Sequence, residues 1–150
     1  MNLLPRRSLL AIAAVTDIAY HARPGPIAAK ALAARHHLPP RHLETLLQVL
    51  VRAGILKGVR GPRGGYELAR ERRRITIADI IRAASGPSAA AEEDDEEGSA
   101  LVRAVVVPAI DHASEVFLEQ LGHVTVDDLC QSAQSKDVFG MSVTAHDFTI

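Results

Sequence analysis

The sequence predicts a mainly α fold with one small β-hairpin, and three observations support this prediction. Apolar residues recur at three- and four-residue steps in several segments, a spacing typical of amphipathic helices. Proline and glycine separate these segments at 24–26, 39–40 and 61–65. Two short runs that suit β-strands flank the turn at 61–65 and predict the hairpin. With 150 residues, the chain is long enough for one domain with a substantial core.

The first predicted helix runs from Ser8 to Ala22 and ends at the turn that contains Pro24 and Pro26. Its apolar face comprises Leu9, Ile12, Ala13, Thr16 and Tyr20. A secretion signal is the alternative, because Arg6 and Arg7 precede a short apolar run. Asp17 interrupts that run and no small-residue cleavage motif follows it, so the sequence favours the helix.

A helix-turn-helix is predicted between residues 27 and 54. The segment from Ile27 to His36 is a short alanine-rich helix, which the prolines at 39–40 end. Pro40 suits the first position of a second helix, where its missing N–H costs no hydrogen bond, and Gly54 suits its C-terminal cap. The buried face of this second helix comprises Leu43, Leu46, Leu47, Leu50 and Val51. A simple helical hairpin is the alternative on this pattern alone.

The hairpin that follows favours the helix-turn-helix. Ile55–Arg60 and Gly65–Ala69 are the two predicted strands, and Gly61–Gly64 is the turn between them. A hairpin directly after a recognition helix is a wing, and this one carries Arg60 and Arg63 at its tip. A phosphate-binding loop is the alternative, but the spacing of the P-loop motif is absent. The fold class is therefore a winged helix-turn-helix domain.

The charge distribution divides the chain into two unlike halves. Residues 1–86 contain 15 basic and 5 acidic side chains, a net charge of +10. Residues 87–150 contain 2 basic and 13 acidic side chains, a net charge of −11. A basic half joined to an acidic half favours a module that binds a polyanion. Together with the predicted wing, it points to double-stranded DNA.

The acidic half begins after one further short helix. Thr76 and Asp79 form a capping pair ahead of an apolar run, and Gly86 and Pro87 end that helix. The six consecutive acids at 92–97 predict a solvated, flexible loop, for which a site for a hard cation is the alternative. A helix then spans residues 99–121, with a kink or restart expected at Pro108. Its apolar stripe comprises Leu101, Val105, Ile110, Ala113, Phe117 and Leu121.

The end of the chain is predicted to hold one more short helix and a tail. Thr125 and Asp128 repeat the capping pattern of residues 76–79 and start that helix. We divide the chain into a winged helix-turn-helix DNA-binding domain at 1–86, an acidic flexible loop at 87–98, a dimerisation helix with the C-terminal short helix at 99–131, and a loose tail at 132–150.

Several function classes are disfavoured by composition. Cys130 is the single cysteine, so no intrachain disulfide and no all-cysteine metal site is possible within one chain. The seven histidines show no metal-ligand spacing, and we expect no metal and no cofactor. No apolar run is long enough for a transmembrane helix, so we expect a cytoplasmic protein with no membrane partner. No nucleophile–base pattern or cofactor loop points to an enzyme.

Four stretches give the sequence a resemblance to a known family. They are 41–44, 50–56, 59–69 and 75–83, and the third contains the wing signature RGPRGGY at 60–66. These residues resemble the Rrf-two (Rrf2) family of bacterial winged helix-turn-helix transcription regulators. The resemblance extends from about Leu4 to Cys130, with an interruption at 87–98.

The resemblance implies a homodimer that binds a palindromic operator. We expect a transcription regulator that acts as a repressor. By family position, Arg41, Glu44 and Thr45 would face bases in the major groove, and Arg60 would enter the minor groove. Gln48 lies on the same exposed side of the predicted helix. The expected phosphate contacts are Arg7, Arg52, Lys57 and Arg63. The family uses the helix at 99–121 for dimerisation, which assigns its apolar stripe to that role.

One property of the family does not transfer to this sequence. Cluster-binding members carry three cysteines near 87–98, where this chain has none, so we expect no family-type iron–sulfur cluster. Two alternatives remain open at this point. The chain could be a protein-interaction module on a degenerate winged helix, or a thiol-based redox regulator that uses Cys130. The sequence identifies no effector.

Overall fold

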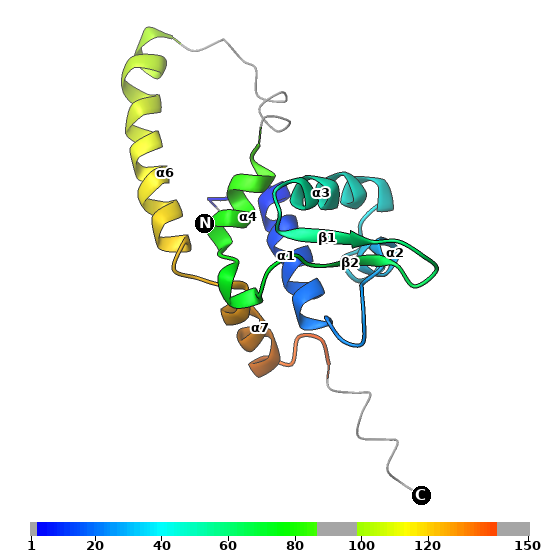
Figure 1. The fold of residues 1–150 in the computed structure, drawn as a ribbon. Helices are drawn as coiled ribbons and strands as arrows, with labels where there is room; N and C mark the ends of the chain where they lie inside the picture. The colour runs from blue at the N-terminus through cyan, green and yellow to red at the C-terminus, as the bar shows by residue number, and fades with distance from the viewer. Residues whose placement is uncertain (1–2, 87–98, 141–150) are drawn as a thin grey trace, which may run out of the picture.

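A computed structural model describes residues 3–86 and 99–140. It confirms a mainly helical fold with one small antiparallel hairpin (Figure 1). The elements are α1 (Arg6–Tyr20), α2 (Ala29–Arg35), α3 (Pro40–Arg52), β1 (Leu56–Val59), β2 (Gly65–Leu68), the 3-10 helix η1 (Arg72–Arg74), α4 (Ile77–Ala84), the π-helical segment η2 (Val102–Val106), α6 (Val107–Leu121) and α7 (Val126–Ser135). No helix in these described ranges is long and apolar enough to cross a membrane.

Local sequence signals fix several helix ends. Thr76 caps α4, because its hydroxyl accepts from the Asp79 amide while the Asp79 carboxylate accepts from the Thr76 amide. Thr125 and Asp128 form the same reciprocal pair at the start of α7. Helix α3 begins with Pro40 and is followed by Gly54, whose φ of 73° is the left-handed conformation that favours glycine. These three sequence predictions are confirmed.

The core is built around α1, which packs against α3, α4, α7 and β2. It consists almost entirely of aliphatic side chains, as the near absence of aromatic residues requires. The largest fully buried apolar side chains are Val15, Ile18, Leu32, Leu43, Leu47, Leu50, Ile55, Leu56, Ile75, Ile80 and Val126. The helix-turn-helix and the wing therefore pack on one continuous hydrophobic core.

The hairpin forms at the predicted position, and it is also joined to the helix-turn-helix. Leu56 pairs with Leu68 and Val59 with Gly65. Ile27 forms an additional bridge with Tyr66, through backbone hydrogen bonds of 2.9 and 2.8 Å. The prediction that α2 begins at Ile27 is therefore wrong, since Ile27 is extended and the helix starts at Ala29. This bridge fixes the wing against the start of the helix-turn-helix.

The long C-terminal helix stands apart from the rest of the fold (Figure 1). Its first part, η2, has π-helical hydrogen bonding, and Pro108 lies just after it. Proline cannot donate a backbone hydrogen bond, and its ring displaces the carbonyl one turn earlier, so the preceding turn widens. The expected discontinuity at Pro108 is present as this π-helical segment.

Helix α7 returns to the core of the N-terminal half. Val126 and Cys130 are buried beside α1, and the Val126 amide donates to the Ile75 carbonyl at 2.9 Å. Residues 126–135 therefore belong to the same core as residues 6–84, which differs from our expected boundary at residue 99. The expected loose tail also starts too early. Helix α7 continues to Ser135, and the Phe139 ring lies 4.6 Å from that of Tyr20. The acidic run 92–97 and residues 141–150 lie outside the described residues.

Candidate nucleic-acid interface

Helix α3 presents a polar face opposite its buried leucines. Arg41, Glu44, Thr45 and Gln48 are all exposed and recur at steps of three and four residues, so they share one side of the helix. Thr45 Oγ1 donates to the Arg41 carbonyl at 3.1 Å, which leaves the hydroxyl oxygen free to accept. Guanidinium, carboxylate, hydroxyl and amide groups on one helix face are the groups that recognise base edges in the major groove.

The turn of the wing depends on glycine at two adjacent positions. A Cβ atom at Gly64 would collide with the backbone carbonyl of Val59, and one at Gly65 would collide with that of Ile27. Glycine therefore permits both the tight turn and the close contact with the helix-turn-helix. Arg60 and Arg63 lie on this turn and are exposed. Two cations on a narrow hairpin suit the negative potential of a minor groove.

A side-chain hydrogen bond connects the recognition helix with the wing, in addition to their packing in the shared core. Gln48 Nε2 donates to the Tyr66 hydroxyl oxygen at 3.0 Å. Tyr66 is half-buried, and its backbone makes the bridge to Ile27. Tyr66 was not among the predicted site residues, because nothing local in the sequence shows that residues 48 and 66 meet. The RGPRGGY motif, which ends at this residue, was the available signal.

The residues predicted to contact phosphates have different surroundings. Arg52 and Arg63 are exposed, at the end of α3 and on the wing turn. The Lys57 ammonium lies 3.0 Å from Glu67 on the facing strand, so its charge is partly neutralised. Arg7 Nε donates to the Ala84 carbonyl at 3.2 Å, which joins the start of α1 to the end of α4. Arg7 is therefore partly structural.

A buried carboxylate anchors the first helix of the helix-turn-helix, and the sequence reasoning missed this role. Asp17 has no exposed surface. It accepts from Arg35 at 2.6 and 2.9 Å and contacts His36 Nε2 and His21 Nδ1, each at 2.9 Å. Arg35 and His36 lie at the end of α2, so the network ties α2 to α1. The available signal was the acid within the apolar run of α1.

Comparison with known proteins identifies the family. Residues 4–132 match the Rrf2 family, which is described as iron-dependent transcriptional regulators. The chain belongs to the Rrf2 family. A protein of Synechocystis sp. that is named as an HTH-type transcriptional regulator is 31% identical over 132 residues, which cover 88% of this chain and 90% of that protein. The sequence resemblance is thus confirmed.

Solved structures of Rrf2 proteins have the same fold. IscR of T. potens superimposes with a TM-score of 0.71 at 31% identity and covers 90% of each chain. CymR of B. subtilis, named as a global cysteine regulator, superimposes with a TM-score of 0.65 at 28% identity. That match covers 88% of this chain and 98% of CymR. The winged-helix class predicted from the sequence is therefore shown.

The long helix of this Rrf2 protein exposes much of its apolar stripe. Leu101 is 64% exposed, Val105 57% and Ile110 60%, and Ala113 is exposed as well. Phe117 is half-buried, and Leu121 packs against the core of its own chain. Residues 101–113 thus form an uncovered apolar surface, whereas Leu121 serves mainly to attach the helix to the domain. Apolar surface of this extent marks an interaction site.

Cys130 lies in the core, which weighs against a thiol-based sensor. Its side chain is 2% exposed. Burial raises the pKa of the Cys130 thiol, Arg72 acts in the opposite direction, and Asp127 adds a smaller increase. Desolvation is the main cause of this raised pKa. A thiol that resists ionisation is a poor nucleophile, because the thiolate is the reactive form.

The family description names iron, so we compared the metal-binding side chains of this chain with those that an iron–sulfur cluster needs. Iron–sulfur clusters are held mainly by cysteine thiolates. The chain contains one cysteine, and its sulfur is buried in the core with a 3.8 Å contact to the Thr16 carbonyl. This donor set does not fit a cluster that requires three thiolates from one chain.

Proposed function

We propose that this protein is a homodimeric transcription regulator that binds a palindromic DNA operator sequence-specifically and represses transcription. One observation carries the proposal. The exposed polar face of α3 and the arginines of the wing belong to two elements that the Gln48–Tyr66 hydrogen bond and the Ile27–Tyr66 bridge hold together. The net charge of +10 on residues 1–86 supports a polyanionic partner.

The exposed groups allow specific roles to be proposed. Glu44 accepts from the N4 amine of cytosine, and Arg41 donates two hydrogen bonds to guanine. Thr45 and Gln48 contact neighbouring bases along the same face of α3, and Arg60 enters the minor groove. Arg63 and Arg52 contact phosphates, as do Lys57 and Arg7 to a smaller extent because each is already partly engaged.

The uncovered apolar surface of the long helix supports the homodimer. A second copy is the partner that presents the same surface, and a two-fold interface is self-complementary. The two identical DNA-binding domains then bind two half-sites that are related by the same two-fold symmetry. The half-sites are separated by about one turn of the DNA helix or a multiple of it. A dimer bound across a promoter prevents access of the polymerase, which supports repression. The site of action is the bacterial cytoplasm, where the operator lies.

Selection from a random duplex library tests this proposal. The full chain is incubated with the library at physiological salt, and the bound duplexes are sequenced after several rounds. We expect an inverted repeat to be enriched. Glu44→Ala should change the preferred base at a major-groove position, and Arg60→Ala should relax preference at an A·T-rich position, each at a cost of about 1–3 kcal/mol.

Arg74→Ala is the matched control. Arg74 is an exposed arginine on η1, so its loss changes the net charge as Arg60→Ala does, without touching α3 or the wing. It should select the parent sequence. Absence of any enriched sequence would contradict the proposal, and identical selection by the Glu44 and Arg60 variants would contradict the assigned roles.

A further inference from the structure

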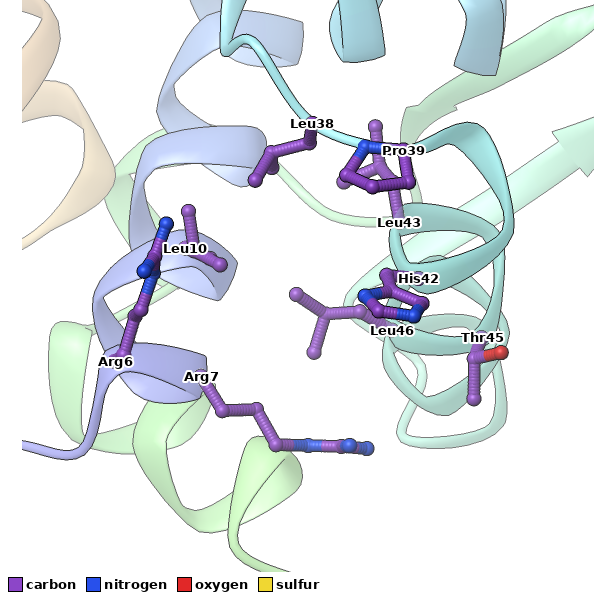
Figure 2. Close-up of a pocket in the computed structure, with 9 residues that line it drawn as sticks. All are labelled: Arg6, Arg7, Leu10, Leu38, Pro39, His42, Leu43, Thr45 and Leu46. Atoms are coloured by element: carbon purple, nitrogen blue, oxygen red, sulfur yellow. The ribbon is translucent and has the colours of Figure 1, made fainter.

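A hollow of about 570 Å³ lies between the start of α1 and the N-terminal half of α3 (Figure 2). Its apolar lining is contributed by Leu10 of α1, by Leu38 and Pro39 of the turn before α3, and by Leu43 and Leu46 of α3. Its volume lies within the range of pockets that bind small organic molecules. The residues that line the hollow include neither Gln48 nor any residue of the wing, so the hollow is distinct from the contact between those two elements.

The polar groups around this hollow are basic or neutral. Arg6, Arg7, His42 and Thr45 line it, and no acidic side chain does. Among the residues that the structure describes, neither Arg6 nor Arg7 makes an ion pair. Arg7 uses its Nε for the Ala84 carbonyl and retains its terminal nitrogens for another acceptor. An apolar lining beside two arginines without ion-pair partners matches a ligand with the opposite charge and an apolar body.

We propose that this hollow is an effector site for an amphiphilic organic anion, a carboxylate attached to an apolar body. The guanidinium groups of Arg6 and Arg7 lie at different edges of the hollow (Figure 2), and both turn toward the carboxylate when it binds, while the apolar body lies against the leucines. The proposal rests on the proposed function, because it assigns the regulation of the same recognition helix. It is independent of iron and of Cys130, which lies in α7.

The position of the hollow determines the sign of the regulation. Arg7 and Thr45 line it and are also proposed DNA contacts. A bound carboxylate draws Arg7 away from phosphate and places a negative charge close to the DNA backbone. Both effects weaken operator binding, and linkage then requires that operator DNA weaken anion binding by the same factor.

Octanoate is a suitable probe, since it combines one carboxylate with a flexible apolar chain. Calorimetric titration of the full chain without DNA, below the concentration at which octanoate forms micelles, measures binding directly. Octan-1-ol, octylammonium and acetate serve as controls for the tail alone, the opposite charge and the charge alone. We expect octanoate to bind at least about tenfold more tightly than each control.

Arg6→Gln is the decisive variant, because Arg6 lines the hollow and has no proposed role in DNA binding. We expect roughly tenfold weaker octanoate binding, as for the loss of one charge-assisted hydrogen bond. Arg74→Gln removes the same charge on η1 and should bind octanoate as the parent does. Saturating octanoate should lower operator affinity several-fold in the parent and in Arg74→Gln, and less in Arg6→Gln at the same concentration.

Different results would overturn this inference and the proposed function. Three results would overturn the effector site: octanoate does not bind, octan-1-ol binds as tightly as octanoate, or the two arginine variants lose octanoate affinity equally. So would dissociation of the dimer by octanoate, since the hollow would then be a contact between two copies. Operator binding is measured separately without octanoate, and its absence would count against the proposed function alone.

Discussion

The side-chain amide of Gln48 in the recognition helix donates a 3.0 Å hydrogen bond to the hydroxyl of Tyr66 in the wing. The Tyr66 backbone is at the same time bonded to Ile27, just before α2. One residue therefore contacts the recognition helix through its side chain and the start of the helix-turn-helix through its backbone. Tyr66 therefore joins the wing to both segments, and it holds the side chain of Gln48, for which we propose a base contact.

Tyr66→Phe tests this positioning role. The variant loses the hydroxyl but keeps the ring and all backbone bonds. We expect operator affinity to fall by roughly fivefold, near the 1 kcal/mol typical of one hydrogen bond, with relaxed preference at the base that faces Gln48. Fluorescence anisotropy with single-base operator variants measures both effects.

Tyr20→Phe is the matched control for that experiment. Tyr20 is the other tyrosine of the chain, and it packs against Phe139 at the end of α1. Its loss should leave operator affinity unchanged. If Tyr66→Phe binds every operator variant as the parent does, the hydrogen bond to Gln48 has no role in recognition.

Asp17→Asn should destabilise the whole domain. The substitution keeps the shape of the side chain but removes the charge that Arg35 and the two histidines contact. We expect the free energy of unfolding to fall by about 3 kcal/mol. This value is at the low end for a broken buried ion pair, because the Arg35 side chain is 37% exposed and can turn to solvent. Urea denaturation followed by circular dichroism measures the change.

Glu119→Gln provides the comparison for Asp17→Asn, since Glu119 is exposed on α6, lies outside the proposed dimer surface and should tolerate the change. Equal stability of the two variants would show that the Asp17 network contributes nothing.

The sequence was sufficient to predict those features that depend only on residues close together in the chain. Thr76 with Asp79, Thr125 with Asp128, Pro40 and Gly54 each specify a helix end through neighbouring residues only. The wing and the exposed face of α3 could be predicted for the same reason. The features that could not be predicted from the sequence depend on contacts between residues far apart in the chain. Asp17 meets Arg35 and His36 only after α2 packs on α1, and residues 126–130 join the core only after the chain has returned from α6.

Ile110→Asp should separate the proposed dimer without unfolding the chain. Ile110 is 60% exposed, so a charge at this position costs little in a monomer but would be buried in a two-fold contact of α6. Sedimentation velocity should show a dimer for the parent and a monomer for the variant, with unchanged circular dichroism.

Val138→Asp is the control for the dimer experiment, because Val138 is equally exposed, at 63%, but lies outside the long helix. It should remain dimeric. A monomeric parent, or a dimeric Ile110→Asp, would refute the role given to α6.

Anaerobic purification tests the proposed lack of a family-type cluster. One buried cysteine per chain cannot supply three thiolates. We expect no visible absorption band of an iron–sulfur cluster, no stoichiometric iron or sulfide, and operator binding that is unaffected by air. Iron and sulfide at stoichiometric levels, lost together with operator binding on exposure to air, would restore a redox-sensing role.

One measurement tests the central claim most directly. The affinity of the full chain for its selected operator is compared with its affinity for a scrambled duplex of equal length and composition, over a range of salt concentrations. We predict that the operator binds about a thousandfold more tightly or better near physiological salt. The logarithm of each binding constant should also fall with the logarithm of salt by roughly 0.9 per neutralised phosphate. Equal affinity for both duplexes, or binding that salt does not change, would contradict the assignment of α3 and the wing as a sequence-specific DNA interface.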